Sequence, residues 1–258
     1  MRSNLPADTR PPPASSFGRI RIESVTTRLV LVIVGVFVVD RILVRQGIFF
    51  SAQLIPGITM HEVPILGLCH FSVGFAFSKW ELWRLLTWPF VHSSPWHVLV
   101  NVASLHFFGP VLESHYGSRR FLVFYILCAA GGLVMYMAMY QIEYLIPNAW
   151  VPMFGASAPV LGLLVAATHV APDARATVYD LFPVHLRTIA WALLGLALYA
   201  MFAYGRAAFA VAADGTSVSP EGGALAHLGG AAVGFALIRS PQWVRLFDWH
   251  PFSRPPPF

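Results

Sequence analysis

Charged residues are scarce in this chain: they make up 11% of its 258 residues, whereas hydrophobic residues make up 57%. A typical soluble domain carries about 25% charged residues, so this composition argues against an ordinary soluble protein and is typical of a membrane protein. Cysteine is scarcer still, with Cys69 and Cys128 alone and no CxxC pair. The sequence therefore predicts neither a structural metal site nor an intramolecular disulfide, and no cofactor is expected.

Acidic residues are nearly absent from the long apolar stretches, where Asp40 beside Arg41 is the nearest exception. A proton or ion pathway usually requires ionisable residues within the membrane spans, so their scarcity ranks that function last. The net charge of +5 requires no nucleic-acid partner. Cytoplasmic loops next to anionic membrane lipid account for it.

Six apolar stretches can be separated, and each approaches the ~20 residues that a helix needs to span about 30 Å of hydrocarbon. They lie at roughly 28–46, 95–112, 120–140, 155–171, 187–204 and 224–238. We therefore predict an all-α membrane protein with six transmembrane helices within residues 23–243. Residues 1–22 are expected to be a disordered cytoplasmic tail, and residues 244–258 a cytoplasmic C-terminal tail.

Lys and Arg are distributed unevenly between the two sets of loops. If the N-terminus is cytoplasmic, twelve lie on that side and five on the other. The positive-inside rule therefore favours a multi-pass protein with cytoplasmic N- and C-termini. In this orientation the second, fourth and sixth segments all start at the outer face. Those starts carry His97, Ser157 and His227.

The connection between the first two segments, residues 47–91, is long and rich in Trp and Phe. Aromatic side chains at this density are typical of the boundary between water and lipid. We therefore predict a structured interfacial loop in the outer leaflet between the first and second helices.

The second segment opens with two histidines and an asparagine. Ser94 before Pro95 predicts an N-cap followed by proline at the first helical position. His97 and Asn101 are then one turn apart on a helix face, and His92 lies just outside the helix. Two donors in this arrangement suit a developing oxyanion. An equally open interpretation is that they hold loop backbone in place.

The fourth segment begins with Gly155-Ala156-Ser157-Ala158-Pro159. Proline is tolerated only near a helix start, so Ser157 lies at or just before the first turn. A serine there is most often an N-cap. The same position surrounds its hydroxyl with unpaired backbone N–H groups at the positive end of the helix dipole, which suits a nucleophile. Gly155 also permits close approach by a substrate backbone.

The sixth segment places His227, Gly230 and Gly234 on one face, because helical residues lie about 100° apart. Small residues let helices pack closely, so the imidazole is expected to press against a neighbouring helix. If that helix is the fourth, the imidazole of His227 reaches the Ser157 hydroxyl. The alternative is that His227 has a structural hydrogen bond within a face that only packs the helices together. No acid lies at the same depth, so we expect a dyad and not a triad.

Together these residues resemble the motifs of the rhomboid intramembrane serine proteases. The resemblance spans roughly residues 28–240. Four motifs occur in the order of that family: Glu81-Leu82-Trp83-Arg84, His92-x4-His97-x3-Asn101, Gly155-Ala156-Ser157 and Ala226-His227-x2-Gly230-x3-Gly234.

The resemblance implies a six-helix transmembrane bundle of rhomboid type with an interfacial outer loop. Ser157 would attack the scissile carbonyl and His227 would act as general base. His97, Asn101 and the Ser157 backbone N–H would stabilise the oxyanion. Residues 187–204 and 205–223 would form the substrate gate and cap. The remaining site residues would be supporting: His92, Gly155, Gly230, Gly234, Trp83 and Arg84, with Glu81 beside them.

The resemblance also implies substrates and a location. The substrates would be single-span membrane proteins, cut near the outer surface where their helices unwind easily, and membrane lipid would be the other partner. The compact six-segment form fits a bacterial inner membrane. This chain departs from the family pattern at Ala158, where glycine is usual and a methyl group would crowd the oxyanion. It departs again at Leu161, where an aromatic often packs on the histidine.

The sequence leaves three kinds of protein to compare: an intramembrane serine endopeptidase, a catalytically weak or inactive relative that binds transmembrane clients, and a protein with an ion pathway. The presence of both Ser157 and His227 favours the first over the second. The scarcity of acids within the spans disfavours the third.

Overall fold

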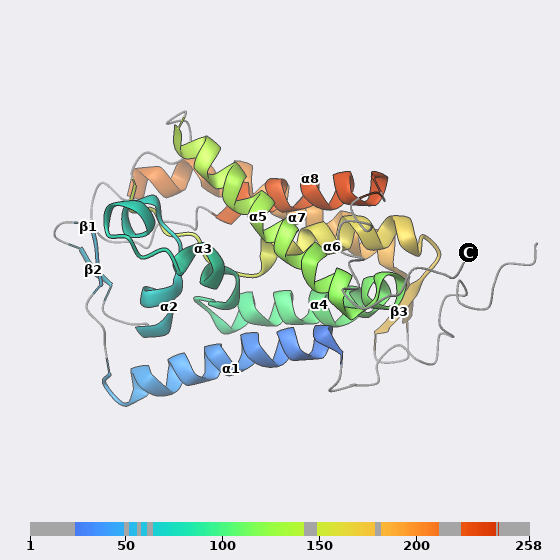
Figure 1. The fold of residues 1–258 in the computed structure, drawn as a ribbon, viewed down its shortest axis with the longest axis horizontal. Coiled ribbons are helices and arrows are strands. Elements are labelled where there is room, and N and C mark those ends of the chain that lie inside the picture. Colours follow the sequence, from blue (N-terminus) through green and yellow to red (C-terminus); the bar gives the residue numbers. More distant parts are fainter. Residues whose placement is uncertain are drawn as a thin grey trace, which may run out of the picture.

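The structure, a computed structural model, describes residues 24–48, 52–55, 58–60, 64–141, 149–178, 182–211, 223–240 and 242. Long helices dominate these ranges (Figure 1): α1 (Val25–Arg45), α4 (Pro95–Tyr116), α5 (Ser118–Gln141), α6 (Ser157–Val170), α7 (Leu186–Val211) and α8 (Gly223–Arg239). Each predicted apolar stretch coincides with one of them, so the predicted helical fold is confirmed. The predicted tails, 1–22 and 244–258, lie outside the described residues.

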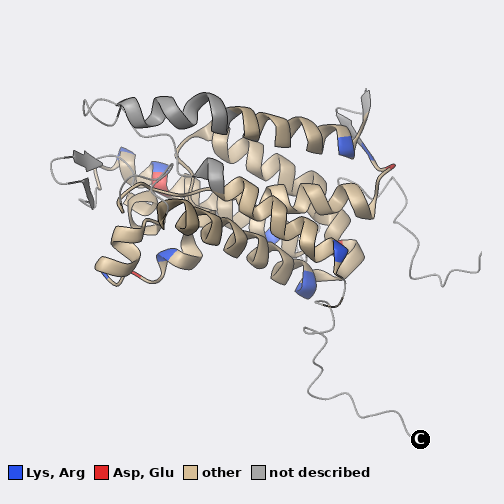
Figure 2. Cartoon of the chain, turned by 90° about the horizontal axis from the view of Figure 1, so that it is seen from above, with Lys and Arg blue, Asp and Glu red and all other residues tan. Residues whose placement is uncertain are grey.

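The helices differ in how well each could cross a membrane. Within the described ranges, α5 alone is long and apolar enough by length and composition, whereas α6, Leu186–Leu196 and Ala226–Arg239 are shorter apolar helices. Among the described residues, Lys, Arg, Asp and Glu lie mostly toward helix ends and in connecting segments (Figure 2). Such a distribution fits an all-α membrane fold, because charge is costly at the bilayer centre.

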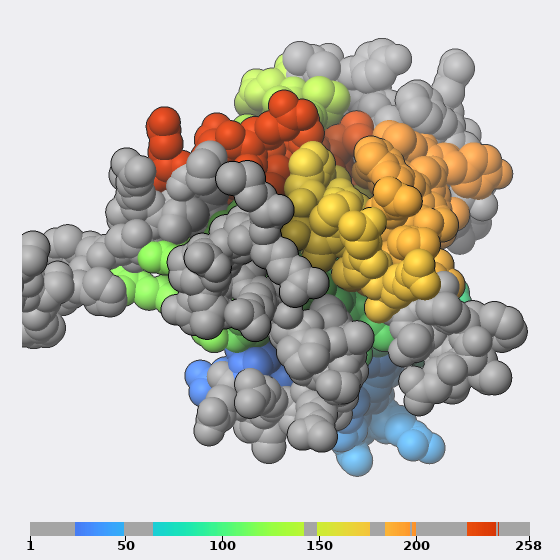
Figure 3. Space-filling model, turned by 90° about the vertical axis from the view of Figure 1, so that its right-hand side faces the viewer, coloured from blue at the N-terminus to red at the C-terminus, as the bar shows by residue number. Residues whose placement is uncertain are grey.

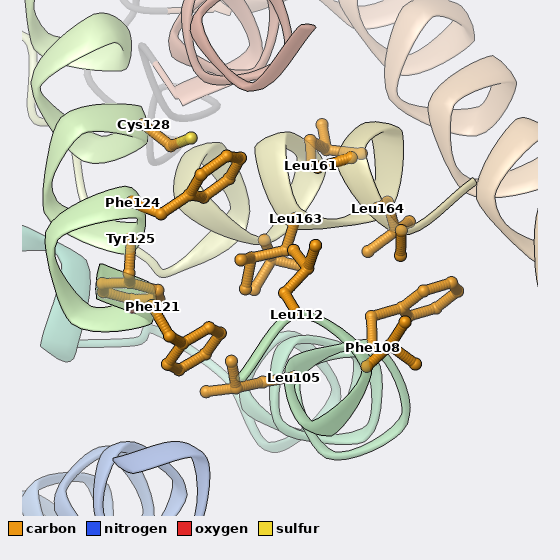
Figure 4. Close-up of a cluster of buried hydrophobic side chains, with 14 of the residues drawn as sticks. Leu105, Phe108, Leu112, Phe121, Phe124, Tyr125, Cys128, Leu161, Leu163 and Leu164 are labelled. Carbon is orange, nitrogen blue, oxygen red and sulfur yellow. The ribbon is translucent and has the colours of Figure 1, made fainter. Parts of the chain in front are cut away.

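The central helix is α6, which contacts α4, α5, α7 and α8. It lies between α7 and α8 at the end of the bundle seen in Figure 3. Leucines of α6 face apolar side chains of α4 and aromatic side chains of α5 in one buried cluster (Figure 4). Because neighbours enclose α6 on several sides, its N-terminus has a fixed position in the bundle.

Glu113, near the end of α4, joins three helices. Its carboxylate accepts hydrogen bonds from the backbone N–H groups of Val25 and Thr26 at 2.8 and 3.0 Å. It also accepts from the hydroxyls of Thr26 and Ser118 at 2.7 and 2.6 Å. The first N–H groups of a helix have no partner within that helix, so the carboxylate caps α1 and attaches it to the start of α5.

The connection between α1 and α4 contains short elements: β1 (Ala52–Ile55), β2 (Ile58–Met60), α2 (Pro64–Cys69), the π-helix η3 (Gly74–Ser78), α3 (Arg84–Thr87) and the 3-10 helix η4 (Trp88–Phe90). Strands β1 and β2 pair as an antiparallel hairpin, as do β3 (Arg175–Val178) and β4 (Phe182–His185). The sequence predicted a structured loop but neither hairpin. Whether the loop lies in the outer leaflet stays a prediction.

Arg84 lies at the centre of this loop, and the whole residue is 1% exposed. Its guanidinium pairs with Glu81 at 2.6 Å and donates to the carbonyls of Gly67 and His70, both at 2.8 Å. It also lies over the Phe75 ring, 4.4 Å from the centroid. A buried cation requires such partners, and the planar guanidinium engages several at once.

Trp83 is far more exposed than Arg84, the next residue. Its ring N–H donates to the Leu68 carbonyl at 3.0 Å, while half of the residue stays exposed. Nearby Trp80 and Leu86 are 77% and 71% exposed. Large apolar side chains exposed together mark a surface that contacts lipid or a partner.

Candidate active site

Ser157 and His227 meet at the interface of α6 and α8. The Nε2 atom of His227 lies 2.5 Å from the Oγ atom of Ser157, although the residues are 70 positions apart. Both are half-buried. Ser157 is the first residue of α6, and the N-cap is Ala156, which has no capping side chain. The serine hydroxyl is therefore paired with the imidazole and is not an N-cap.

Glycines allow the close approach that this contact requires. A Cβ atom added to Gly230 would collide with the Ala158 carbonyl, and one added to Gly234 would collide with the Gly162 carbonyl. Two glycines one turn apart therefore seat α8 directly on the backbone of α6. The predicted small-residue face of the sixth segment packs on the fourth segment, and His227 lies toward the N-terminal end of that face.

The segment that leads to Ser157 is fixed by backbone hydrogen bonds. Phe71 and Met153 exchange two of them, at 2.7 and 2.8 Å, in an isolated antiparallel bridge. The Gly155 N–H donates to the Trp88 carbonyl at 3.0 Å, and the Tyr136 hydroxyl donates to the Val151 carbonyl at 2.6 Å. Apart from Gly155, which was predicted as a supporting residue, the residues that form these bonds were not predicted as part of the site. Most of these hydrogen bonds join backbone groups, so the pattern of side chains in the sequence does not indicate where they form.

Gly155 brings His97 to the serine turn. Its φ angle is +103°, in the region that favours glycine. A Cβ atom built on it would lie 2.6 Å from Cε1 and 2.7 Å from Nε2 of His97. The imidazole therefore packs against the backbone two residues before Ser157. As predicted, Ser94 caps α4, where its hydroxyl accepts from the His97 backbone N–H at 3.2 Å.

Asn101 and His92 lie beside this ring. The Asn101 side-chain nitrogen donates to the His97 carbonyl at 3.0 Å and lies 3.2 Å from Nε2 of His92. The same Nε2 atom accepts from the Ala156 backbone N–H at 3.3 Å. The rings of His92 and His97 meet edge-on with centroids 4.8 Å apart. The histidine and asparagine motif therefore lies against the serine turn.

The structure gives Ala158 a different environment from the one expected. Its methyl group is buried in an apolar cluster with Tyr136 and Ala226. It faces Gly132 of α5, where a Cβ atom would lie only 2.7 Å from it. A glycine on α5 thus makes room for the methyl group. Leu161, the second departure, is 5% exposed in the apolar core.

This pairing predicts a compensating effect. Gly132→Ala is expected to destabilise the protein by about 1–3 kcal/mol, because it overpacks the contact with the Ala158 methyl. Adding Ala158→Gly is expected to recover most of that loss, measured as the midpoint of thermal unfolding in detergent. Gly195→Ala is the control, because nothing lies within 4 Å of that glycine. Strict additivity of the two substitutions would contradict the predicted contact.

Metal ligands do not gather in the part of the chain that the structure describes: no three His, Cys, Asp or Glu side chains there could hold an ion. What the described residues contain is a hydroxyl and an imidazole in hydrogen-bond contact at the start of a buried helix. The fold and site thus define a helical protein with a serine–histidine pair between two of its helices.

The chain belongs to the rhomboid family, because the model of the Rhomboid domain matches residues 79–240, more than half of its length. Membership makes it an integral membrane protein, as the composition predicted. The matched region begins within the loop before α3 and ends just after α8. It therefore contains Ser157, His227, His92, His97 and Asn101.

Three relatives illustrate the range of the family. Rhomboid-like protease 3 of Toxoplasma gondii is 33% identical over 89 residues, covering 34% of this chain and 31% of that protein. The putative rhomboid protease YdcA of Bacillus subtilis is 34% identical over 93 residues, covering 36% and 42%. Inactive RHOMBOID-like protein 8 of Arabidopsis thaliana is 40% identical over 52 residues, covering 20% and 15%. Each match covers less than half of the relative's own length. Two of the three relatives are named as proteases, and the third is named as inactive.

Proposed function

We propose that this protein is an intramembrane serine endopeptidase that cuts transmembrane segments of other membrane proteins. The observation that carries the proposal is the 2.5 Å contact between Oγ of Ser157 and Nε2 of His227. At that distance a neutral imidazole can take the hydroxyl proton as the oxygen attacks a carbonyl carbon. The imidazolium then protonates the leaving amine, and water hydrolyses the resulting ester of Ser157.

The oxyanion is stabilised from two sides in this proposal. The Ser157 backbone N–H lies in the first turn of α6, where N–H groups have no partner within the helix and the dipole favours negative charge. The His97 ring faces the same turn across Gly155. Asn101 becomes a third donor when one of its amide hydrogens leaves its present acceptor.

The length of α6 supports cleavage below the membrane surface. Its 14 residues extend over about 21 Å, whereas the hydrocarbon layer is about 30 Å thick. If α6 ends at the cytoplasmic boundary, Ser157 lies about 9 Å inside the outer boundary. A substrate helix must unwind there to expose a peptide bond, so single-span proteins with helix-breaking residues are the proposed substrates.

The proposed topology has six membrane spans, cytoplasmic termini and a bacterial inner membrane as its location. Arg119 and Arg120 at the start of α5 and Arg239 at the end of α8 support the orientation, because basic residues are enriched on the cytoplasmic side. His227 lies toward the opposite end of α8 from Arg239, and Ser157 begins α6, which is followed by Arg175 at the start of β3. Membrane lipid is the second proposed partner, and neither a cofactor nor nucleic acid is required.

The test is cleavage of a panel of single-span reporter proteins by the purified protein in lipid vesicles. Mass spectrometry maps the cut, which is expected within the outer part of a helix that contains glycine or proline. Ser157→Ala is expected to abolish cleavage. The control is Ser104→Ala, which removes the hydroxyl of a different buried serine, on α4. Cleavage by Ser157→Ala at the wild-type rate would contradict the proposal.

The pH dependence provides a second check. Cleavage requires neutral His227, so the rate is expected to fall as acidification protonates the imidazole. Burial, and secondarily the charge of His97, lowers the pKa of His92 to about 3. Burial and then the Arg84 charge lower the pKa of His70 to about 4. Neither ring therefore gains charge in the folded protein between about pH 5 and 8, so neither ring accounts for a loss of activity in that range.

Acid also affects stability, and this effect must be measured separately. His70 and His92 bind protons in the unfolded chain at their ordinary pKa of about 6.5, above their values in the folded protein. The unfolded state then holds more protons, so stability decreases as the pH falls below that value. Unfolding midpoints of Ser157→Ala at each pH provide the correction. A flat cleavage profile from about pH 5 to 8 would contradict a histidine base.

A catalytically inactive protein that binds transmembrane clients is the second candidate. The match to Inactive RHOMBOID-like protein 8 favours it. It predicts that reporters co-purify with the wild-type protein and with Ser157→Ala equally, with no cut in either sample.

A further inference from the structure

His92 lies at the junction of α4 with the serine turn, and its side chain is almost fully buried, with 1% of the residue exposed. A single ring atom, Nε2, lies 3.3 Å from the Ala156 backbone nitrogen and 3.2 Å from the Asn101 side-chain nitrogen. Ala156 immediately precedes Ser157. One imidazole atom thus links the residue before the serine to the polar face of α4.

The two partners determine the protonation state of this ring. A backbone N–H can only donate, so Nε2 of His92 must accept and carries no proton. The orientation of the Asn101 amide is fixed by its other partner, the His97 carbonyl, which can only accept. His92 is therefore neutral, with its hydrogen on Nδ1. The lowered pKa of His92, caused first by burial, agrees with this state.

We propose that His92 is a positioning residue whose Nε2 atom holds the Ala156–Ser157 turn in register with Asn101 and His97. The inference rests on the proposed function and deepens it. The ring accepts a hydrogen bond from the Ala156 backbone N–H, which is then not available to a substrate. The Ser157 backbone N–H, the next along the chain, is left to face a substrate oxyanion. By accepting from Asn101, the ring fixes the amide beside His97. His92 itself does not contact the reacting atoms.

Two variants separate the acceptor from the bulk of the ring. His92→Gln places a carbonyl oxygen near the position of Nε2, and such an oxygen accepts two hydrogen bonds. His92→Leu fills the space without an acceptor. We expect His92→Gln to keep kcat within about threefold of wild type. We expect His92→Leu to lower kcat by about 100-fold with little change in KM, the scale of a misplaced reacting group.

The expected split between kcat and KM distinguishes positioning from packing. A residue that only fills space lowers the unfolding midpoint and leaves kcat unchanged at temperatures where the protein is folded. Both variants are therefore assayed well below their measured unfolding midpoints. Wild-type kcat in His92→Leu would overturn the proposal, as would equal loss of kcat in the glutamine and leucine variants.

A measurement that requires no proteolysis tests the same inference in Ser157→Ala. Nitrogen NMR of histidine labelled at both ring nitrogens, with His92→Gln to assign the signal, reports which nitrogen carries the proton. We expect a single neutral form with hydrogen on Nδ1 from about pH 8 to 5. A proton on Nε2 in that range would overturn the proposal. Absence of cleavage by the wild type would instead contradict only the proposed protease function.

Discussion

Replacement of His227 with alanine is expected to lower the rate of reporter cleavage by about 10²–10⁴-fold, the usual contribution of a general base. The imidazole is the hydrogen-bond partner of the Ser157 hydroxyl at 2.5 Å, so its removal leaves the oxygen without a proton acceptor at that position. The double variant with Ser157→Ala is expected to be no slower than Ser157→Ala alone, because residues that act as one unit are not additive.

His169→Ala is the matched control for this result. His169 lies at the opposite end of α6, exposed, with its ring 5.8 Å from that of Phe235. Its removal is expected to leave kcat and KM unchanged. If His227→Ala and His169→Ala cleave at the same rate, the imidazole at the serine is not the base, and the contact has only a structural role.

Gly155→Ala is expected to lower the rate of cleavage by about 100-fold. An alanine at φ +103° is strained by about 1–3 kcal/mol, and its methyl group would lie 2.6 Å from Cε1 of His97. Either the ring or the turn must move, and both belong to the proposed oxyanion site. The measurement is kcat on the best-cut reporter, alongside the unfolding midpoint.

Gly117→Ala separates backbone strain from the collision. Gly117 also has a positive φ, +79°, but nothing lies within 4 Å of a Cβ atom there. It is therefore expected to lose stability of the same order and to keep wild-type kcat. If both alanine variants lose activity in proportion to their stability, the contact between Gly155 and His97 does not govern catalysis.

Much of the fold could be predicted from local patterns in the sequence. Apolar stretches located the long helices, and Ser94 before Pro95 located the start of α4. The small-residue face with Gly230 and Gly234 predicted which side of α8 packs closely. These patterns succeed because helix formation and close packing depend on residues a few positions apart. The contact between α6 and α8 was then the simplest way to join a serine to a histidine.

Other features depended on long-range or backbone contacts and could not be predicted. The Phe71–Met153 bridge uses only main-chain groups, which any residue except proline provides. The fit of the Ala158 methyl depends on Gly132, a glycine on another helix. The capping role considered for Ser157 was wrong, because Ala156 occupies the N-cap. Helix ends also differed, since α7 continues to Val211.

If Ser157 is a nucleophile that His227 activates, a serine-directed fluorophosphonate probe should label Ser157 in native membranes. We expect one labelled peptide containing Ser157, with labelling abolished by Ser157→Ala, strongly reduced by His227→Ala and unchanged by His169→Ala and Ser104→Ala. Full labelling of His227→Ala, or no labelling of the wild-type protein under conditions that label an active serine hydrolase, would contradict it.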